Sequence, residues 1–361
     1  MNRLPVLQEA MTGAGVDLVV VGPTSNLRYL LDYKAEAIDR ITVLLVTTRS
    51  SVMLIPDFDV PEFLAKTGFE SVVGWNDRVG PSLGVSEAFD KLGGLPEDPV
   101  TAVDDELTFR FLASLRSRLG RREPVLASEL FTALRIIKSE EEQKKMERVG
   151  ELVSLGVDTA IESARPGISE TKLRSEIEGA LWDQGAESMD EVLVQSGPES
   201  ASPHHQASGR QLREGEPVLF DIAVRMDGYF ADITQQVFFG DPPDHYVQAY
   251  EAVYAAQEAG VEAACVGATV ESVHRASNQV LARAGFPSEL RTGHGLGLDV
   301  HEPPSVDEAN LMVLQPRMVI TVEPGIYLTG RYGIRIEDTV LITEAGPKRL
   351  TRGSRPLQVK K

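Results

Sequence analysis

The sequence has little cysteine, fewer basic than acidic residues, and no long apolar run. Cys265 is the only cysteine in 361 residues, so an internal disulfide and a thiolate zinc site are both excluded, and a reducing cytoplasm is expected. The 54 acidic residues outnumber 36 basic ones, and a net charge of −18 argues against binding nucleic acid or anionic membranes. No apolar run approaches the roughly 18 residues of a membrane span, and polar residues interrupt the N-terminus early, so we also expect no signal peptide.

The length and the 42% hydrophobic content favour two domains. Residues 1–128 alternate helical and strand patterns, which predicts an N-terminal α/β domain with a mixed sheet. Ser139 and Glu142 then form a capping-box pattern at the start of a long helix, within a second domain at 129–361. In the first domain we expect helices at 4–15, 85–94 and 107–120 and strands at 16–22, 41–48 and 51–56.

The second domain contains a weak internal repeat. The segments SARPGISETKLRSEIEGALWDQGAE and AACVGATVESVHRASNQVLARAGFP share a pattern in which Gly167 and Gly267 each precede a Ser or Thr helix cap. Each half then continues with helices followed by strands. This predicts a duplicated α+β domain, whose two halves are related by a pseudo-twofold and place corresponding hairpins side by side.

The stretch LFDIAVRMDGYFADITQQVFFG predicts a hairpin that carries two buried carboxylates. Its turn is Asp227-Gly228, a strong two-residue turn signal. Pairing outward from this turn sets Ala223 opposite Asp232, with Asp221 diagonal to Asp232 on the same face, at a Cβ separation of roughly 7 Å or less. Two bare carboxylates would repel there, whereas a divalent cation between them would remove that cost.

A second acidic hairpin follows in ITVEPGIYLTGRYGIRIEDTVLIT. A three-residue loop centred on Gly330 would set Glu323 opposite Glu337, and the segment RTGHGLGLDVHEPP adds His294 between glycines. Each of these residues alone is unremarkable in a strand or loop. Four carboxylates and one imidazole together predict a two-metal site, and these hard ligands suit Mn²⁺, Co²⁺ or Fe²⁺, with Zn²⁺ as an alternative.

These motifs resemble the pita-bread metallopeptidases, a family that includes prolidase, aminopeptidase P and methionine aminopeptidase. The N-terminal part is likewise similar to the creatinase/prolidase N-terminal domain. The resemblance implies two divalent metal ions per chain, with Mn²⁺ favoured, and a homodimer. The family's ordered ligand set of Asp, Asp, His, Glu and Glu falls on Asp221, Asp232, His294, Glu323 and Glu337.

The same resemblance assigns further roles. His204 in SPHH, rather than the adjacent His205, corresponds to a substrate-facing histidine. His301 in VHEPP corresponds to a second catalytic histidine, and Arg335 in RIED to the arginine that braces the ligand carboxylates. Glu323 is the expected general base.

The chain also departs from the family pattern. Ala223 stands where a glycine is frequent, and Gln235 stands where an arginine is frequent. The segment HEPPSVDEANL lacks the arginine that in several prolidases holds the carboxylate of the dipeptide. We therefore expect Arg40, with Lys34 as a further candidate, to bind that carboxylate from a loop of the N-terminal domain that, in a dimer, would reach over the active site of the partner chain.

The motifs HEPP, EPGIY and RIED favour the proline-specific branch of the family. The expected function is hydrolysis of Xaa-Pro dipeptides, and aminopeptidase P, which acts on longer proline-containing peptides, is the close alternative. A metal-free hydrolase of the creatinase type and a non-enzymatic binding protein are remote alternatives, because members of those kinds lose the ligand set that is complete here.

Overall fold

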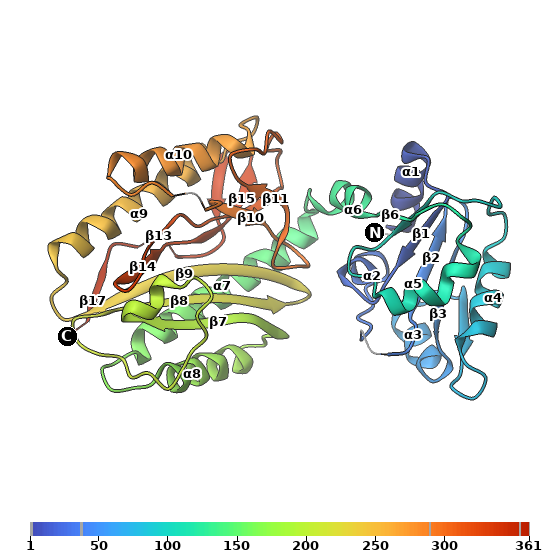
Figure 1. Ribbon diagram of the computed structural model, residues 1–361, viewed down its shortest axis with the longest axis horizontal. Coiled ribbons are helices and arrows are strands. Elements are labelled where there is room, and N and C mark those ends of the chain that lie inside the picture. Colours follow the sequence, from blue (N-terminus) through green and yellow to red (C-terminus); the bar gives the residue numbers. More distant parts are fainter. Residues whose placement is uncertain (1–2, 37–38, 289, 354, 361) are drawn as a thin grey trace. The chain divides into compact units, whose positions relative to one another are not determined.

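The computed structural model describes residues 3–36, 39–288, 290–353 and 355–360 (Figure 1). The chain forms two compact units, residues 1–135 and 136–361. The boundary therefore follows α6 (Ser128–Arg135), whereas the sequence pattern placed it at 128/129. Helix α6 belongs to the first unit because it packs on α1 (Leu4–Ala14) of that unit.

The N-terminal unit is built on one mixed six-stranded sheet, as the sequence predicted. The strand order is β4-β3-β2-β1-β5-β6, with β2 antiparallel to both β1 and β3 and the other pairs parallel. The strands are β1 (Leu18–Val21), β2 (Val43–Thr47), β3 (Ser51–Pro56), β4 (Val72–Trp75), β5 (Thr101–Val103) and β6 (Val125–Leu126).

Three of the helices of this unit overlap the ranges predicted from the sequence, at residues 4–14, 81–92 and 109–115, whereas those at 25–31 and 60–67 were not predicted. Helix α1 ends at Gly15, which takes the left-handed φ of 66° that glycine tolerates without strain. Helix α4 (Pro81–Leu92) packs on β2, β3 and β4 and buries Val85, Ala88 and Phe89 in the core of the unit. The remaining elements are α2 (Ser25–Leu31), η1 (Asp57–Asp59), α3 (Val60–Thr67), α4 (Pro81–Leu92), α5 (Phe109–Leu115) and η2 (Arg116–Arg118).

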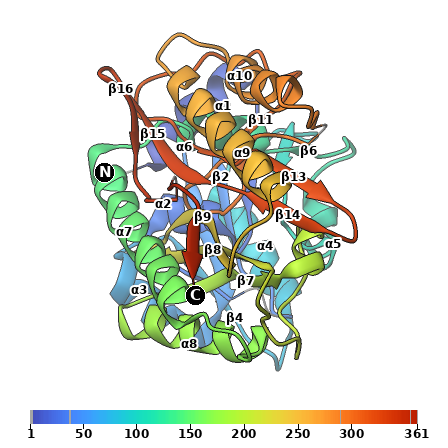
Figure 2. The same ribbon diagram turned by 90° about the vertical axis from the view of Figure 1, so that its left-hand side faces the viewer.

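The C-terminal unit contains two helix pairs on opposite sides of its strands, as both ribbon views show (Figures 1 and 2). The helices are α7 (Glu140–Ser163), α8 (Glu170–Asp183), α9 (Asp244–Ala263) and α10 (Val270–Arg283). Helix α7 begins with the predicted capping box, in which Ser139 and Glu142 bond each other's backbone N–H groups. Helices α7 and α8 pack together on the β8–β9 side, and α9 packs with α10 on the other side.

The two halves repeat in detail, which confirms the duplication. Ser169 caps α8 and Thr269 caps α10, and each side-chain oxygen accepts a hydrogen bond from the backbone N–H of the third residue that follows it. Gly167 N–H donates to the carbonyl of Leu212 at 2.9 Å, and Gly267 N–H donates to that of Leu314 at the same distance. Because both helix pairs are fixed to their strands in the same way, each half presents its strands to the middle of the unit (Figure 2).

The first acidic hairpin has the predicted register. Strand β8 (Pro217–Met226) pairs with β9 (Tyr229–Phe239) so that Met226 lies opposite Tyr229 and Ala223 opposite Asp232. Strand β7 (Ser188–Ser196) pairs with the other edge of β8, and β17 (Gln358–Lys360) pairs with β9. Asp221 lies opposite Thr234 and so on the face of Asp232.

The second hairpin is interrupted, which the sequence did not predict. Each of its two predicted strands is divided into two shorter strands. Strands β12 (Val319–Val322) and β15 (Asp338–Thr343) pair in one sheet, and β13 (Gly325–Leu328) and β14 (Tyr332–Arg335) pair in another. Val322 lies opposite Asp338 and Gly325 opposite Arg335, so the register is the same on both sides of the break. Glu323 and Glu337 fall within the break, where the chain passes from one sheet to the other.

The sheet that holds β12 also contains the histidine strand. Its order is β11-β10-β12-β15-β16, and all its pairs are antiparallel. The additional strands are β10 (Gly293–Gly295), β11 (Glu302–Val306) and β16 (Gly346–Arg349). His294 is thereby placed on a strand directly beside β12, which ends one residue before Glu323.

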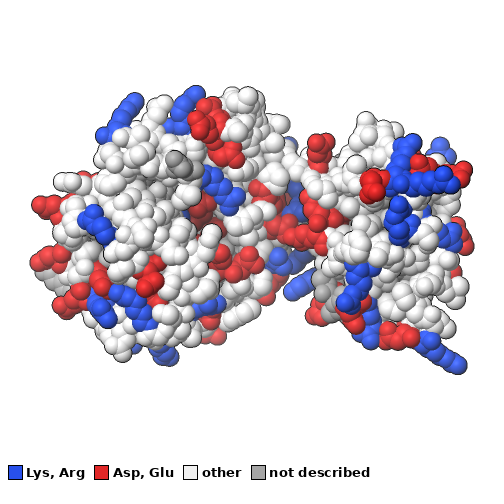
Figure 3. All heavy atoms as spheres, viewed as in Figure 1, with Lys and Arg blue, Asp and Glu red and all other residues white. Residues whose placement is uncertain are grey.

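Acidic and basic side chains are interspersed on the face of the molecule drawn in Figure 3. The acidic excess of the sequence is thus spread among other charges on this face. Among the helices of the described part of the chain, none is long and apolar enough to cross a membrane.

Candidate active site

A cavity of about 350 Å³ in the C-terminal unit brings together every candidate residue predicted in that unit. Strands of both halves reach it, β8 and β9 from the first and β10, β13 and β14 from the second. The predicted residues in its lining are His204, Asp221, Asp232, His294, His301, Glu323, Arg335 and Glu337.

Three of these residues form a compact group that could hold a metal ion. One ligand atom each from Asp232, His294 and Glu337 lies within 4.8 Å of the others, and all three residues are buried. The Oδ1 atom of Asp232 and the Oε1 atom of Glu337 are buried and accept no hydrogen bond from any described residue. A buried carboxylate oxygen without a donor is costly unless a cation meets it, so this donor set fits a divalent metal ion.

His294 presents its free nitrogen to the carboxylates. Its Nδ1 lies 3.0 Å from the carbonyl oxygen of Gly295, and because a carbonyl only accepts, Nδ1 carries the proton. The opposite nitrogen, Nε2, lies 3.4 Å from Glu323 and 3.9 Å from Asp232. Burial lowers the pKa of His294 to about 4, so the neutral form suited to metal binding is present at neutral pH.

The buried carboxylates destabilise one another's charged forms. Burial raises the pKa of Asp232, and the charge of Asp221 raises it further. Burial also raises the pKa of Glu337, with Asp232 adding to the effect. The same desolvation raises the pKa of Glu323. A divalent cation would relieve this repulsion, which again fits the donor set.

Arg335 braces the remaining ligands. Its Nη2 forms a short ion pair with Asp221, and its Nη1 donates to the hydroxyl of Tyr327 at 2.6 Å. Its Nε donates to Thr234 at 3.0 Å, and Thr234 in turn donates to Glu337 at 2.7 Å. One guanidinium therefore orients carboxylates on both halves of the unit, as expected for this arginine.

The two predicted catalytic histidines lie at the open side of the cavity. The ring of His301 meets that of His294 edge-on, with 4.3 Å between the ring centres. Desolvation, together with the nearby His294 and Arg291, lowers the pKa of His301 to about 4, which leaves a neutral ring with one N–H to donate. His204 also lines the cavity, whereas the ring of His205 lies 3.5 Å from Glu170 and 3.6 Å from Glu199.

Comparisons with known proteins now place the chain. Residues 144–344 match the model of metallopeptidase family M24, and residues 3–137 match the creatinase/prolidase N-terminal domain. The chain belongs to metallopeptidase family M24. Its fold is accordingly the pita-bread catalytic domain preceded by a creatinase/prolidase N-terminal domain.

Several M24 relatives are similar along nearly their whole length. A probable dipeptidase PepE of Mycobacterium tuberculosis is 35% identical, over 96% of this chain and 92% of the relative. A Xaa-Pro dipeptidase of Pyrococcus horikoshii is 32% identical, over 99% of this chain and 98% of the relative. The crystal structure of a prolidase from Thermococcus sibiricus, at 31% identity, covers 99% of this chain and 98% of its own, with a TM-score of 0.92.

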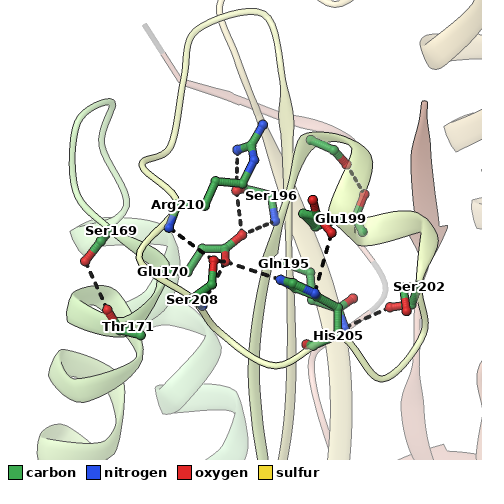
Figure 4. A network of polar contacts seen from close by, with 12 residues as sticks. Ser169, Glu170, Thr171, Gln195, Ser196, Glu199, Ser202, His205, Ser208 and Arg210 are labelled. Atoms are coloured by element: carbon green, nitrogen blue, oxygen red, sulfur yellow. Dashed lines mark hydrogen bonds and ion pairs between the residues drawn. The ribbon is translucent and has the colours of Figure 1, made fainter. Parts of the chain in front are cut away.

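In this M24 chain a polar network holds the segment that carries His204 (Figure 4). At its centre, the fully buried carboxylate of Glu170 accepts hydrogen bonds from the backbone and hydroxyl groups of Ser196 and Ser208. Gln195 donates to the carbonyls of Ser202, Pro203 and His205. These bonds turn His205 toward the network, so that His204 is the neighbour that faces the cavity.

Sequence reasoning missed several residues that line the cavity. Glu191 lies beside Asp221, and burial and that neighbour raise its pKa to about 7. Leu290, Arg291 and Tyr327 also line the cavity. Glu191 and Arg291 lie in stretches of sequence without a motif that would single them out. Tyr327 could have been found, because it lies two residues after Gly325 on the same strand and therefore on the same face.

Two residues that the sequence singled out lie elsewhere. Gln235, in place of the family's arginine, is fully buried and donates to the carbonyl of Gly353 at 2.6 Å, so it supports the C-terminal segment. Arg40, in the N-terminal unit, is held by Asp77 through its Nη2 at 2.7 Å and its Nε at 3.1 Å. Arg40 therefore already has an anionic partner within its own unit.

Proposed function

We propose that this M24 metallopeptidase is a Xaa-Pro dipeptidase, which hydrolyses the bond before proline in dipeptides. The observation that carries the proposal is a cavity in which the buried group Asp232, His294 and Glu337 meets three further carboxylates and two further histidines. The names of its relatives, among them a probable dipeptidase and a Xaa-Pro dipeptidase, support the dipeptide class.

The proposed metal site uses Asp221, Asp232, His294, Glu323 and Glu337 as ligands for two divalent ions. This set of four carboxylates and one imidazole favours Mn²⁺, with Co²⁺, Fe²⁺ and Zn²⁺ as alternatives. Divalent ions bound there would supply a water molecule acidic enough to act as a nucleophile near neutral pH.

The protein groups around that site would carry the proton and charge steps. Glu323 would accept the proton of the attacking water. His301, neutral and with one N–H, would donate to the carbonyl oxygen of the scissile bond as negative charge develops on it. His204 would hold the substrate, and Arg335 would keep Asp221 in its orientation.

The cavity also offers groups for the two ends of a dipeptide substrate. Glu191, which lies beside Asp221, is a carboxylate suited to the free amine of the first residue. Exposed Leu290 offers an apolar side for the proline ring, and a proline nitrogen needs no acceptor because it carries no N–H. These features favour a short substrate with a free N-terminus.

The test compares Leu-Pro with Leu-Pro-Gly on the Mn²⁺-loaded enzyme. A dipeptidase will show the larger kcat/KM on Leu-Pro. If Leu-Pro-Gly is hydrolysed faster, the protein is instead an aminopeptidase P, the alternative within the proline-specific branch. If neither peptide is hydrolysed and no metal is retained, the peptidase assignment itself fails.

A further inference from the structure

One arginine that lines the cavity has no hydrogen-bond partner among the described residues. Two arginines line the cavity, Arg291 and Arg335. Arg335 is bonded to Asp221, Thr234 and Tyr327. Arg291 is exposed and makes no hydrogen bond or ion pair with any residue that the structure describes. A guanidinium at a binding cavity that lacks a protein partner is suited to an anionic ligand.

The backbone next to Arg291 is firmly attached to the catalytic groups. The following residue, Thr292, accepts a hydrogen bond at its carbonyl from Glu323 N–H at 2.8 Å and donates its own N–H to Val306 at 2.8 Å. Its hydroxyl also meets the ring of His274 at 2.9 Å. The side chain of Arg291 therefore extends from a fixed point beside Glu323.

The charge of Arg291 reaches the reacting end of the cavity. Desolvation is the largest cause that lowers the pKa of His294 and of His301, and the positive charge of Arg291 lowers both pKa values further. The lining also holds Glu191, whose pKa is raised to about 7 by burial and by the charge of Asp221. The lining thus offers both an acidic and a basic group to a zwitterionic ligand.

A dipeptide carries its free carboxylate close to the bond that is hydrolysed. In Xaa-Pro the free carboxylate stands on the carbon next to the scissile nitrogen, so it lies three bonds from the carbon that is attacked. Each additional residue moves the terminal charge about 3.3–3.6 Å farther along an extended chain. A cation that selects dipeptides must therefore lie beside the catalytic groups, as Arg291 does.

We propose that Arg291 binds the free carboxylate of the dipeptide and thereby sets the preference for dipeptides over longer peptides. This inference rests on the proposed function. Arg291 would take the place of the arginine that the segment after His301 lacks. The inference also favours Arg291 over Arg40, because the guanidinium of Arg40 already has Asp77 as a partner within its own unit.

The experiment uses two substrates that share the scissile bond and differ only in the terminal charge, Leu-Pro and Leu-Pro-NH₂. For Arg291→Ala, we expect KM for Leu-Pro to rise by about tenfold to a hundredfold, the size of a lost hydrogen bond to a charged group. We expect kcat/KM for Leu-Pro-NH₂ to stay within about twofold. Any influence of Arg291 on His301 or Glu323 would affect both substrates equally, so only a contact with the carboxylate changes their ratio.

Three further variants sharpen the result. Arg291→Lys keeps the charge without the two-pronged geometry and should restore part of the loss. Arg283→Ala removes an exposed arginine of α10 outside the cavity and controls for net charge. Arg40→Ala tests the rival arginine, and we expect it to leave both substrates unchanged.

The outcomes separate this inference from the proposed function. If the unmodified enzyme hydrolyses Leu-Pro and Arg291→Ala does so with the same KM, or loses both substrates equally, the role of Arg291 is wrong. If the unmodified enzyme leaves Leu-Pro intact but hydrolyses Leu-Pro-Gly, the proposed function is wrong. A rise in KM confined to Arg40→Ala would assign the carboxylate to the N-terminal unit instead.

Discussion

Asp232 is a single residue whose burial destabilises the metal-free folded state but suits the proposed metal site. Its side chain is buried with one oxygen that has no donor among the described residues, and its nearest charged neighbours are other carboxylates. Without a cation, this arrangement disfavours the folded state, because a buried charge with no partner keeps its full desolvation penalty.

We therefore predict opposite effects of Asp232→Asn on the metal-free and metal-loaded protein. In chelator, the variant should unfold at a temperature several degrees higher than the parent, since roughly 1–3 kcal/mol of burial penalty is removed and about 1 kcal/mol shifts Tm by 2–4 °C. In excess Mn²⁺, the parent should gain stability and the variant should not. Thermal melts measure both, with the exposed Asp241→Asn as control.

Chelated parent protein that already melts at the temperature of its Mn²⁺-loaded form would contradict this account. So would a variant that is stabilised by Mn²⁺ as strongly as the parent.

Under the proposed function, His301 and Glu323 act on the reaction rather than on the fold. His301 is exposed at the cavity, and Glu323 lies at the end of a strand, so neither holds a core together. We expect His301→Ala and Glu323→Gln to keep the circular dichroism spectrum of the parent and to lose about 10²–10³-fold in kcat, the usual effect of losing a group that acts in the transition state.

A matched control for these variants is His245→Ala, which removes an exposed histidine that stacks on Tyr332. Its kcat should remain that of the parent. Turnover of Leu-Pro by His301→Ala at the parent rate would show that the assigned role is wrong.

Among the structural elements, helix α8 carries a feature that its repeat partner lacks. The residue after the cap of α8 is the buried Glu170, whereas the corresponding residue after the cap of α10 is the buried Val270. The helix start therefore does not need a carboxylate. Instead, Glu170 binds Ser196 and Ser208, the two ends of the segment that carries His204.

We predict that Glu170→Gln lowers kcat/KM on Leu-Pro by about tenfold or more. Four donors bond the two oxygens of the carboxylate, whereas an amide offers only one oxygen to accept them. Each lost hydrogen bond to a charged group is worth about 1.5–3 kcal/mol. Metal content should not change, since Glu170 touches none of the proposed ligands. Glu199→Gln, which alters only an exposed partner of His205, should be close to the parent. Equal activity of both variants would remove the assigned role of this network.

At the scale of the whole molecule, the catalytic groups are unevenly distributed. Every residue that lines the cavity belongs to the C-terminal unit of 136–361. The N-terminal unit has a sheet and a core of its own, and the sequence predicted no catalytic residue in it. Together with the family resemblance, this makes an assembly role the expected one for that unit.

We therefore predict a homodimer in solution. Sedimentation at low micromolar concentration should give a species of twice the 39.4 kDa chain mass. A single species at the chain mass, in protein that hydrolyses Leu-Pro, would contradict this prediction.

Much of the fold and the site could be predicted from the sequence, because local patterns determine register. The turn at Asp227-Gly228 sets which residues of β8 and β9 face each other, so Asp221 and Asp232 had to share a face. The loop at Gly330 did the same for the second hairpin. Capping residues likewise marked the helix starts, as at Ser139.

The tertiary structure alone decided which of those residues meet and what surrounds them. The break between the two sheets at Glu323 and Glu337 depends on how β12 and β13 pack, which no local pattern encodes. The orientation of the His205 ring depends on the buried carboxylate of Glu170, which belongs to a helix distant in sequence. The proposed role of Arg291 could not be found from the sequence. It depends on the lack of a hydrogen-bond partner among the described residues and on proximity to groups elsewhere in the chain, which are properties of three-dimensional packing.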